Sequence, residues 1–170
     1  RDRVNCVGIS ESNGWRKESW IEKADIDEFK FEFNGWDPRL RKLIEGIDQT
    51  TVYKWALYRR PIIKKWHTDR QVLLGDSCHA ILPFLAQGAA LAIEDAAVLA
   101  NCLSEGRDSK NAFSSYQRLR ERRVRWVRFM SNANAHSFHF SDQLAPLRNF
   151  LLKRFSGHAL DRLYRYEANS

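Results

Sequence analysis

The sequence predicts a mixed α+β fold, made of strands from partial sheets, an alanine-rich helix and a long helical region at the C-terminus. Three observations predict it. Short β-prone runs bounded by turn residues lie in the first half of the chain. Alanine dominates residues 88–103, which contain no proline and no glycine after the first position. Apolar residues then recur at helical spacing through residues 111–134.

The first predicted elements are strands. Residues 3–9 and 15–20 are β-prone and flank a turn-like segment at residues 10–14, so together they predict a hairpin. Residues 51–58 are a third strand candidate, and residues 71–75 form a short apolar run that ends at a glycine. Both would lie in a sheet.

The remaining elements are helices. Asp37 is a suitable N-cap, and the proline after it favours a first helical turn, so residues 38–47 predict a helix. Residues 25–33 have an ambiguous period that fits a helix or a strand. Residues 145–155 and 158–166 predict one or two further helices.

The composition excludes several classes of protein. No window approaches the roughly 20 apolar residues of a membrane span, and the N-terminus has no apolar stretch of a secretory signal. Cys6, Cys78 and Cys102 are too few and too widely spaced for a disulfide framework or a structural zinc site. We therefore expect a reducing, cytoplasmic environment, no bound metal and no membrane span.

The net charge of +7 belongs to the C-terminal part of the chain. Residues 1–110 hold 17 basic and 17 acidic side chains, whereas residues 111–170 hold 11 and 4. Six arginines form the densest run: Arg118, Arg120, Arg122, Arg123, Arg125 and Arg128. Apolar residues interrupt this run, so we expect a solvated or interdomain helix face whose acidic partners lie elsewhere, and no nucleic-acid partner.

Residues 73–96 contain the candidate ligand-binding residues of the chain. A buried strand ends in Gly75-Asp76, a loop follows, and an alanine-rich helix begins at Gly88. A glycine lets a bulky ligand approach the main chain, and the Asp76 carboxylate could accept hydrogen bonds from ligand hydroxyls. The amides at the helix start and the positive end of the helix dipole would favour a negative charge.

This segment resembles the second flavin-binding segment of the FAD-dependent aromatic hydroxylases, a family of flavoprotein monooxygenases. The matching residues are Gly75-Asp76, His79, Pro83, Gln87-Gly88 and Glu94-Asp95-Ala96. The resemblance is greatest to the salicylate hydroxylase and 3-hydroxybenzoate 6-hydroxylase branch, and it extends over residues 4–130. It implies that Glu94 and Asp95 fix the helix rather than do chemistry.

The resemblance implies a cofactor site. Asp76 would bind the ribityl hydroxyls of FAD, and Gly75 would give the room for them. Ala89, with the amides of Gly88 and Ala90, would lie by the N1–C2=O edge of the flavin ring, where the reduced ring carries negative charge.

The resemblance also implies which residues face the substrate. Pro83 and Phe84 would line the loop that faces the flavin and the aromatic substrate. His79 could act as a base, or it could satisfy backbone groups in the turn as a neutral imidazole. Some relatives carry a polar residue where this chain has Pro83, so the catalytic residues stay unassigned.

The activity implied is the hydroxylation of a phenolic aromatic compound. NADH or NADPH would reduce FAD, O₂ would form a flavin C4a-hydroperoxide, and one oxygen atom would pass to the substrate. The family's N-terminal G-x-G-x-x-G unit does not occur in these 170 residues. We expect a missing N-terminal part of the same enzyme as partner, and no activity or FAD retention without it. The alternative is a truncated, non-catalytic relative that acts as a binding or interaction module.

The resemblance divides the chain into three parts. Residues 1–66 would contribute to the sheet and a helix of the substrate domain. Residues 67–105 would form the C-terminal segment of the FAD-binding domain, which includes the alanine-rich flavin helix. Residues 106–170 would form the basic helical C-terminal region.

Overall fold

The computed structural model describes residues 4–10, 19–58, 60–61, 63–106, 108–138 and 143–168. The chain divides into two compact units, residues 1–57 and residues 58–170. Each unit is described by itself.

The first unit contains two short α-helices and a 3₁₀ turn: α1 (Ile26–Glu32), α2 (Pro38–Glu45) and η1 (Gln49–Thr51). The Asp25 carboxylate accepts a hydrogen bond from the backbone at the start of α1, and Asp37 does the same for α2. These caps satisfy amides that have no partner inside a helix. The helix predicted from residue 38 is confirmed, and it ends at Glu45.

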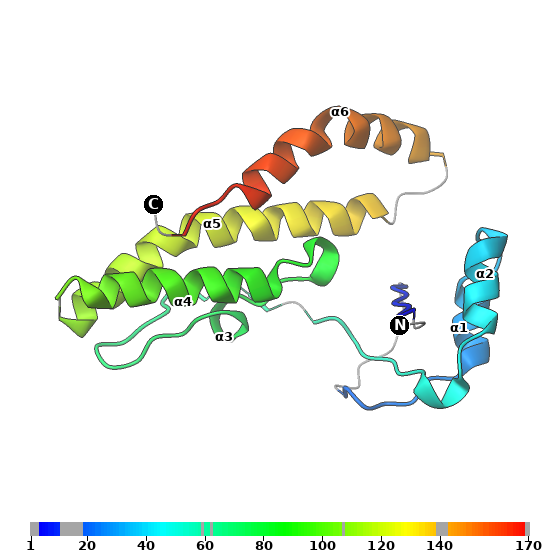
Figure 1. Cartoon of the computed structure of the whole chain (residues 1–170), viewed down its shortest axis with the longest axis horizontal. Helices are drawn as coiled ribbons and strands as arrows, with labels where there is room; N and C mark the ends of the chain where they lie inside the picture. Colours follow the sequence, from blue (N-terminus) through cyan, green and yellow to red (C-terminus); the bar gives the residue numbers. More distant parts are fainter. Residues whose placement is uncertain are drawn as a thin grey trace. The chain divides into compact units, whose positions relative to one another are not determined.

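The second unit consists of helices joined by extended loops (Figure 1). Its elements are α3 (Asp76–His79), η2 (Pro83–Leu85), α4 (Gly88–Ser104), α5 (Ser109–Phe138) and α6 (Ala145–Tyr164). The alanine-rich helix and the long helix after it are confirmed, and the last predicted helical segments form one helix. Helices α4 and α5 lie side by side over most of the length of α4 (Figure 1).

The described residues contain no β-strand, so the predicted α+β class with partial sheets is wrong. Residues 4–9 have no regular secondary structure, and residues 51–58 and 71–75 each contain one isolated bridge residue. Residues 11–18, which include most of the second strand of the predicted hairpin, lie outside the described residues.

Among the residues that the structure describes, the extended segments pair through two antiparallel bridges, Lys23 with Tyr53 and His67 with Val72. A strand becomes regular only where a second extended segment binds its backbone N–H and C=O groups over several residues. In the described part of the chain, residues 51–58 and 71–75 each meet such a neighbour at one residue pair, and residues 4–9 form no bridge. These segments therefore have extended backbone, as their composition favours, but they do not form a sheet.

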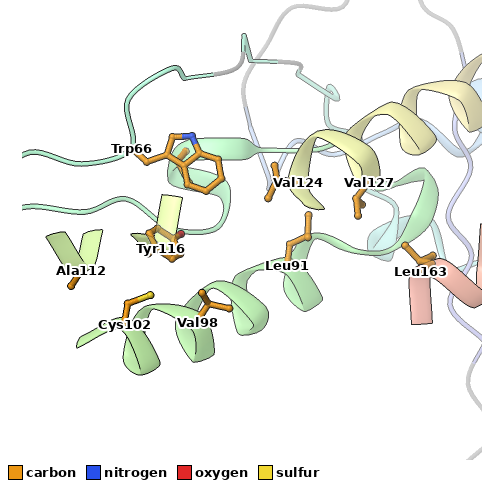
Figure 2. Packing of buried hydrophobic residues seen from close by; sticks show 10 residues of the cluster. Trp66, Leu91, Val98, Cys102, Ala112, Tyr116, Val124, Val127 and Leu163 are labelled. Carbon is orange, nitrogen blue, oxygen red and sulfur yellow. The ribbon is translucent and has the colours of Figure 1, made fainter. Parts of the chain in front are cut away.

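The core of the second unit lies between α4, α5 and the loop that precedes α3 (Figure 2). Trp66 is 1% exposed, and Leu91, Tyr116 and Val127 are fully buried. Leu163 of α6 also belongs to this cluster. Burial of these large apolar side chains fixes α5 against α4 and positions the loop before α3.

None of the helices in the described residues is long and apolar enough to cross a membrane.

Candidate flavin site

The loop before α3 turns sharply at Gly75. Its φ of 59° and ψ of −141° lie in a region that is almost restricted to glycine. A Cβ atom at this position would also lie 3.0 Å from the Cβ of Ala92 on α4. Glycine is therefore required both for the backbone angles and for the close approach of α4.

Asp76 follows this turn, and its side chain lies beside the start of α4. A Cβ atom at Gly88 would lie 4.0 Å from Oδ1 of Asp76, and Asp76 is exposed. Gln87, the N-cap of α4, makes no side-chain cap hydrogen bond. The structure thus brings together Gly75, Asp76 and Gly88, with the exposed Ala89 and partly exposed Ala90 in the first turn of α4.

Pro83 and Phe84 lie on η2, between α3 and α4. Pro83 is exposed, whereas Phe84 is partly buried against α5. The Phe84 ring lies 6.0 Å from that of Phe138, and the Phe84 carbonyl accepts a hydrogen bond from Nδ2 of Asn134 at 3.2 Å. The Leu82 carbonyl accepts another from Oγ of Ser131 at 2.7 Å. Helix α5 therefore fixes this loop through its backbone.

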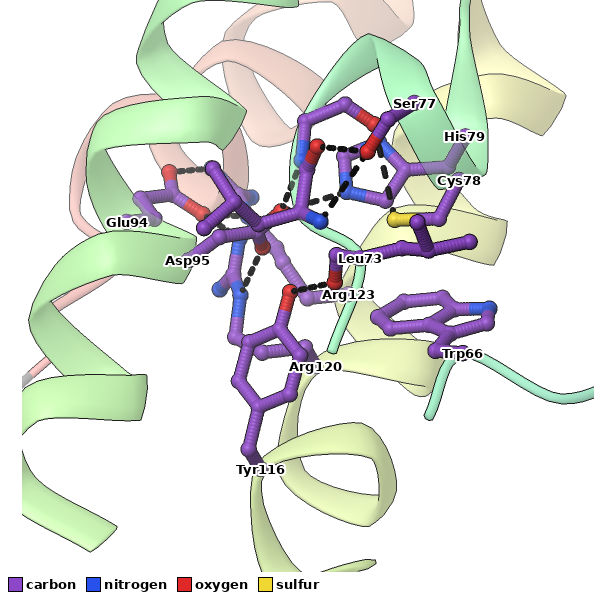
Figure 3. A network of polar contacts seen from close by, with 12 residues as sticks. Trp66, Leu73, Ser77, Cys78, His79, Glu94, Asp95, Tyr116, Arg120 and Arg123 are labelled. Atoms are coloured by element: carbon purple, nitrogen blue, oxygen red, sulfur yellow. Dashed lines mark hydrogen bonds and ion pairs between the residues drawn. The ribbon is translucent and has the colours of Figure 1, made fainter. Parts of the chain in front are cut away.

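A buried carboxylate lies behind the Gly75 turn (Figure 3). Oδ2 of Asp95 accepts a hydrogen bond from the Gly75 N–H at 2.9 Å and lies 2.5 Å from Nε2 of His79. Its Oδ1 accepts a hydrogen bond from Nε of Arg120 at 2.8 Å. Asp95 and Arg120 are both 0% exposed. One side chain of α4 thereby joins the turn, α3 and α5.

Arg120 uses the rest of its guanidinium to reach two other groups. Nη2 donates to Oε2 of Glu94 at 2.6 Å, and Nη1 donates to the hydroxyl of Tyr166 at 2.8 Å. Arg123 donates to the other Glu94 oxygen at 2.9 Å and to the Leu163 carbonyl at 2.9 Å. The planar fork of arginine suits such a network, because several donors are held in a fixed geometry.

The pKa values of Asp95 and Arg120 are both shifted toward the charged form. Burial by itself would raise the pKa of Asp95, but the hydrogen bonds from His79, Arg120 and the Gly75 amide lower it below the usual value. Burial likewise disfavours the charge on Arg120, but Asp95 and Glu94 outweigh it and raise the arginine's pKa. The site therefore contains a buried, hydrogen-bonded ion pair rather than neutral groups.

Cys78, His79 and Asp95 each place one potential metal-ligand atom within 4.8 Å of the other two. Burial, followed by the charge on Asp95, raises the pKa of the Cys78 thiol to about 12. A metal-binding cysteine must be a thiolate, and the Asp95 oxygens already accept hydrogen bonds from three groups. This donor set fits a structural role.

His79 is buried and packs against the Trp66 ring, with 5.2 Å between the ring centroids. The alternative in which its imidazole satisfies backbone groups predicted the wrong partner, since Nε2 contacts the Asp95 carboxylate. His79 is also remote from solvent, at 3% exposure.

Sequence reasoning missed the roles of Arg120, Arg123 and Tyr166. Of the two alternatives, a solvated or an interdomain arginine face, the solvated one is wrong for Arg120 and Arg123, which are buried. Their acidic partners, Glu94 and Asp95, lie in this same chain and not in a missing part. The spacing of these arginines along the helix indicated which of them are buried. Positions 116, 120, 123, 124 and 127 share one stripe of α5 and are buried, whereas 118, 122 and 125 are exposed.

Comparison with known proteins identifies the family. A family model described as an FAD binding domain matches residues 44–129, which is half of the chain and includes the Gly75 turn and all of α4. The match also covers Asp95 and Arg120.

Several monooxygenases are related to this chain. It is 40% identical over 117 residues to the 6-hydroxynicotinate 3-monooxygenase of Pseudomonas fluorescens, an alignment that covers 68% of the chain and 30% of that protein. It is 36% identical over 140 residues to a 3-amino-4-hydroxybenzoate 2-monooxygenase of Streptomyces platensis, with 82% and 35% covered. An FAD-dependent monooxygenase of Beauveria bassiana is 35% identical over 125 residues, with 71% and 29% covered.

The chain spans about a third of the length of these relatives. The family match and the relatives agree with the resemblance found in residues 73–96. The chain therefore belongs to the FAD-binding domain family of the aromatic-ring monooxygenases.

Proposed function

We propose that this chain forms the C-terminal part of an FAD-dependent monooxygenase that hydroxylates a phenolic aromatic compound, with NADH or NADPH as reductant and O₂ as oxidant. The observation that carries the proposal is the position of the exposed Asp76 carboxylate beside the uncapped start of α4. Within the sequence-derived division, residues 67–105 supply the FAD-binding segment, and residues 1–66 and 106–170 supply substrate-domain and helical parts.

The residues present fit the flavin. A carboxylate is the group that accepts hydrogen bonds from the ribityl hydroxyls, and the amides at a helix start suit the electron-rich N1–C2=O edge of the ring. Asp76 provides the first, and the amides of Gly88, Ala89 and Ala90 provide the second. Gly75 keeps the main chain free of a side chain at the turn.

The bound flavin would supply the redox chemistry that activates O₂ for transfer of one oxygen atom to the substrate. The residues of this chain bind and orient it. Asp76 holds the ribityl chain, the first turn of α4 stabilises negative charge on the ring edge, and Pro83 and Phe84 line the loop toward the substrate. Because α5 anchors the carbonyls of Leu82 and Phe84, this loop is held in place to exclude water.

The names of the relatives favour a hydroxylated aromatic substrate. One relative acts on 6-hydroxynicotinate and another on 3-amino-4-hydroxybenzoate, and both compounds carry a ring hydroxyl. A ring hydroxyl makes the aromatic carbon atoms electron-rich, which suits attack by an electrophilic oxygen. We assign no catalytic base within this chain. The rest of the site, including the part that binds the ADP half of FAD, is assigned to the N-terminal part of a cytoplasmic enzyme.

The test uses the full-length protein encoded by the gene that contains this chain. FAD affinity is measured by fluorescence titration for the wild type, for Asp76→Ala and for the control Asp69→Ala, an aspartate that is also exposed. We expect Asp76→Ala to weaken FAD binding at least tenfold, as the loss of hydrogen bonds to a charged acceptor implies. The Asp69→Ala control should bind as the wild type does, and equal affinity of all three proteins would refute the assignment.

Hydroxylation is tested separately. The FAD-loaded full-length protein is mixed with NADH or NADPH and a series of hydroxylated benzoates and nicotinates, and oxygen uptake is compared with product formation. A hydroxylated product supports the monooxygenase. FAD binding without NAD(P)H oxidation or product for any of these compounds would instead indicate a non-catalytic relative.

A further inference from the structure

The buried side chain of Asp95 fixes the position of the turn that precedes Asp76. The Gly75 amide donates to Oδ2 of Asp95 at 2.9 Å, so the carboxylate determines where the backbone before Asp76 lies. His79, at the end of the same short helix as Asp76, contacts the same oxygen. Figure 3 shows Asp95 between His79 of α3 and Arg120 of α5. Both ends of α3 are thus tied to one atom.

The network continues from Asp95 to the C-terminal segment, residues 162–166. Arg120 binds Oδ1 of Asp95 and donates to the Tyr166 hydroxyl at 2.8 Å. The Tyr166 ring lies under two guanidinium groups, 4.4 Å from that of Arg123 and 5.2 Å from that of Arg120. Arg123 also donates to the backbone carbonyls of Arg162 and Leu163.

A buried arginine has few alternatives when one acceptor is lost. Arg120 is 0% exposed, so loss of the Tyr166 hydroxyl leaves its Nη1 to be satisfied by water that enters the vacated space or by a local rearrangement. Any such rearrangement acts on Asp95, because both groups bind the same guanidinium, and Asp95 holds the Gly75 amide. Three consecutive hydrogen bonds therefore link the C-terminal segment to the turn: Tyr166 to Arg120, Arg120 to Asp95, and Asp95 to the Gly75 amide.

We infer that Asp95 is a positioning residue for the cofactor-binding turn and that residues 162–166 are part of its support. The inference rests on the proposed function, in which the turn presents Asp76 to FAD. In the proposed site, Asp95, Arg120 and Tyr166 are not assigned to contact the cofactor; they hold the turn that presents Asp76 to it. Such support matters because a binding group that is displaced by a fraction of an ångström loses much of its contribution.

A purely structural network would behave differently from a positioning one. If the network of Asp95, Arg120 and Tyr166 only stabilised the fold, removing one of its hydrogen bonds would lower the unfolding temperature and leave the FAD affinity of the folded protein unchanged. If it positions Asp76, its loss weakens FAD binding, and the loss has no further effect once Asp76 has been removed. A double-mutant comparison separates the two cases.

The experiment compares Tyr166→Ala, Tyr166→Phe and the control Tyr164→Ala in the full-length protein. Tyr164 is the last residue of α6, two residues before Tyr166, and is 70% exposed. We expect Tyr166→Ala to weaken FAD binding about tenfold and Tyr166→Phe, which keeps the ring over the arginines, about threefold. The control should stay within a factor of about two, which is ordinary for a surface change. In the Asp76→Ala background, Tyr166→Ala should change the affinity by less than a factor of about two.

Two results of the affinity measurements overturn the inference: equal affinities of Tyr166→Ala and Tyr164→Ala, or a full effect of Tyr166→Ala in the Asp76→Ala background. These variants remove no charge from the core, so they test the inference even where Asp95→Asn fails to fold. Amide hydrogen exchange of residues 73–79 in the FAD-free protein gives a second readout. Exchange should be faster in Tyr166→Ala than in Tyr164→Ala, and equal exchange would overturn the support role.

The two proposals can fail separately. If Asp76→Ala leaves FAD binding unchanged, the proposed cofactor site is wrong, whatever the exchange of residues 73–79 shows. If Asp76→Ala weakens binding and the Tyr166 variants do not, the site is supported and the inference about its support is wrong.

Discussion

Nε2 of His79 lies 2.5 Å from Oδ2 of Asp95, and the two side chains are 3% and 0% exposed. The other oxygen of Asp95 binds Arg120, so the carboxylate lies between a histidine and an arginine that come from different helices. Its negative charge is held by these groups and by the Gly75 amide. The stability of the second unit should therefore depend on the protonation of Asp95.

The first prediction concerns the stability of the folded chain at low pH. The pKa of Asp95 in the folded chain lies below the ordinary value of 3.8. The stabilisation is thus complete above about pH 4 to 5 and is lost as the pH falls through the lowered pKa. Asp95→Asn leaves Arg120 without this partner and should cost about 3 kcal/mol at pH 7.

Thermal unfolding of the chain between pH 7 and pH 3 checks this prediction. The difference between wild type and Asp95→Asn should be largest at neutral pH and should shrink below pH 4. Asp69→Asn, at a position that is 72% exposed, serves as the control. A difference between wild type and Asp95→Asn that is constant over the whole range would show that the charge on Asp95 contributes nothing.

The second prediction concerns the turn. Gly75→Ala forces a side chain into a backbone region that only glycine adopts easily, and it places a Cβ 3.0 Å from the Cβ of Ala92. The strained backbone and the contact with α4 should together cost about 2 to 4 kcal/mol. Gly106→Ala is a matched control, because Gly106 has a φ of 71° but no atom within 4 Å of its added Cβ.

Urea denaturation of the two variants gives the comparison. We expect Gly106→Ala to lose about 1 kcal/mol, which is the usual cost of a positive φ in a residue with a side chain. The additional loss in Gly75→Ala measures two costs together: the backbone angles of Gly75, which are rarer than a positive φ alone, and the close approach of α4 to the turn. Equal losses would mean that neither adds to the cost of a positive φ.

Helices α2, α4, α5 and α6 were predictable because their signals are local, whereas residues 25–33 fitted a helix or a strand and α3 was expected to be a loop. Asp37 and the proline after it fix the start of α2, and the alanine composition of residues 88–103 matches α4 almost to its ends. Strands depend on a partner elsewhere in the chain, and residues 71–75 meet one at a single bridge. Their composition favours extended backbone, but composition alone cannot supply the second strand.

The same distinction applies to the site. Gly75, Asp76 and Gly88 lie in one short segment, so their proximity follows from the loop and helix that join them. The ion pair of Asp95 with Arg120 spans 25 residues, and the contact of Arg120 with Tyr166 spans 46. The position of Arg120 on the apolar stripe of α5 indicates burial, but nothing local to Tyr166 indicates its partner.

The third prediction concerns the cysteines. Cys6 is exposed, whereas Cys78 is buried and has a pKa of about 12. Because only the thiolate reacts, a thiol reagent at pH 8 should label Cys6 within minutes and leave Cys78 unmodified in the folded chain. Mass spectrometry of digested protein after timed labelling distinguishes them. Labelling of both at similar rates would mean that the region around α3 opens readily, whereas labelling of Cys78 only in denaturant would confirm its burial.

The last prediction concerns flavin retention. In the proposed site, Asp76 and the first turn of α4 would bind the ribityl chain and the flavin ring. No G-x-G-x-x-G unit for the ADP half occurs among the 170 residues. Roughly half of the cofactor would then have no protein contact, so the chain expressed alone should be purified colourless. The absorbance of the purified chain between 350 and 500 nm, about where flavins absorb, measures the flavin bound per chain. A stoichiometric yellow protein would show that these residues bind the whole cofactor by themselves, and it would remove the need for an N-terminal partner in FAD binding.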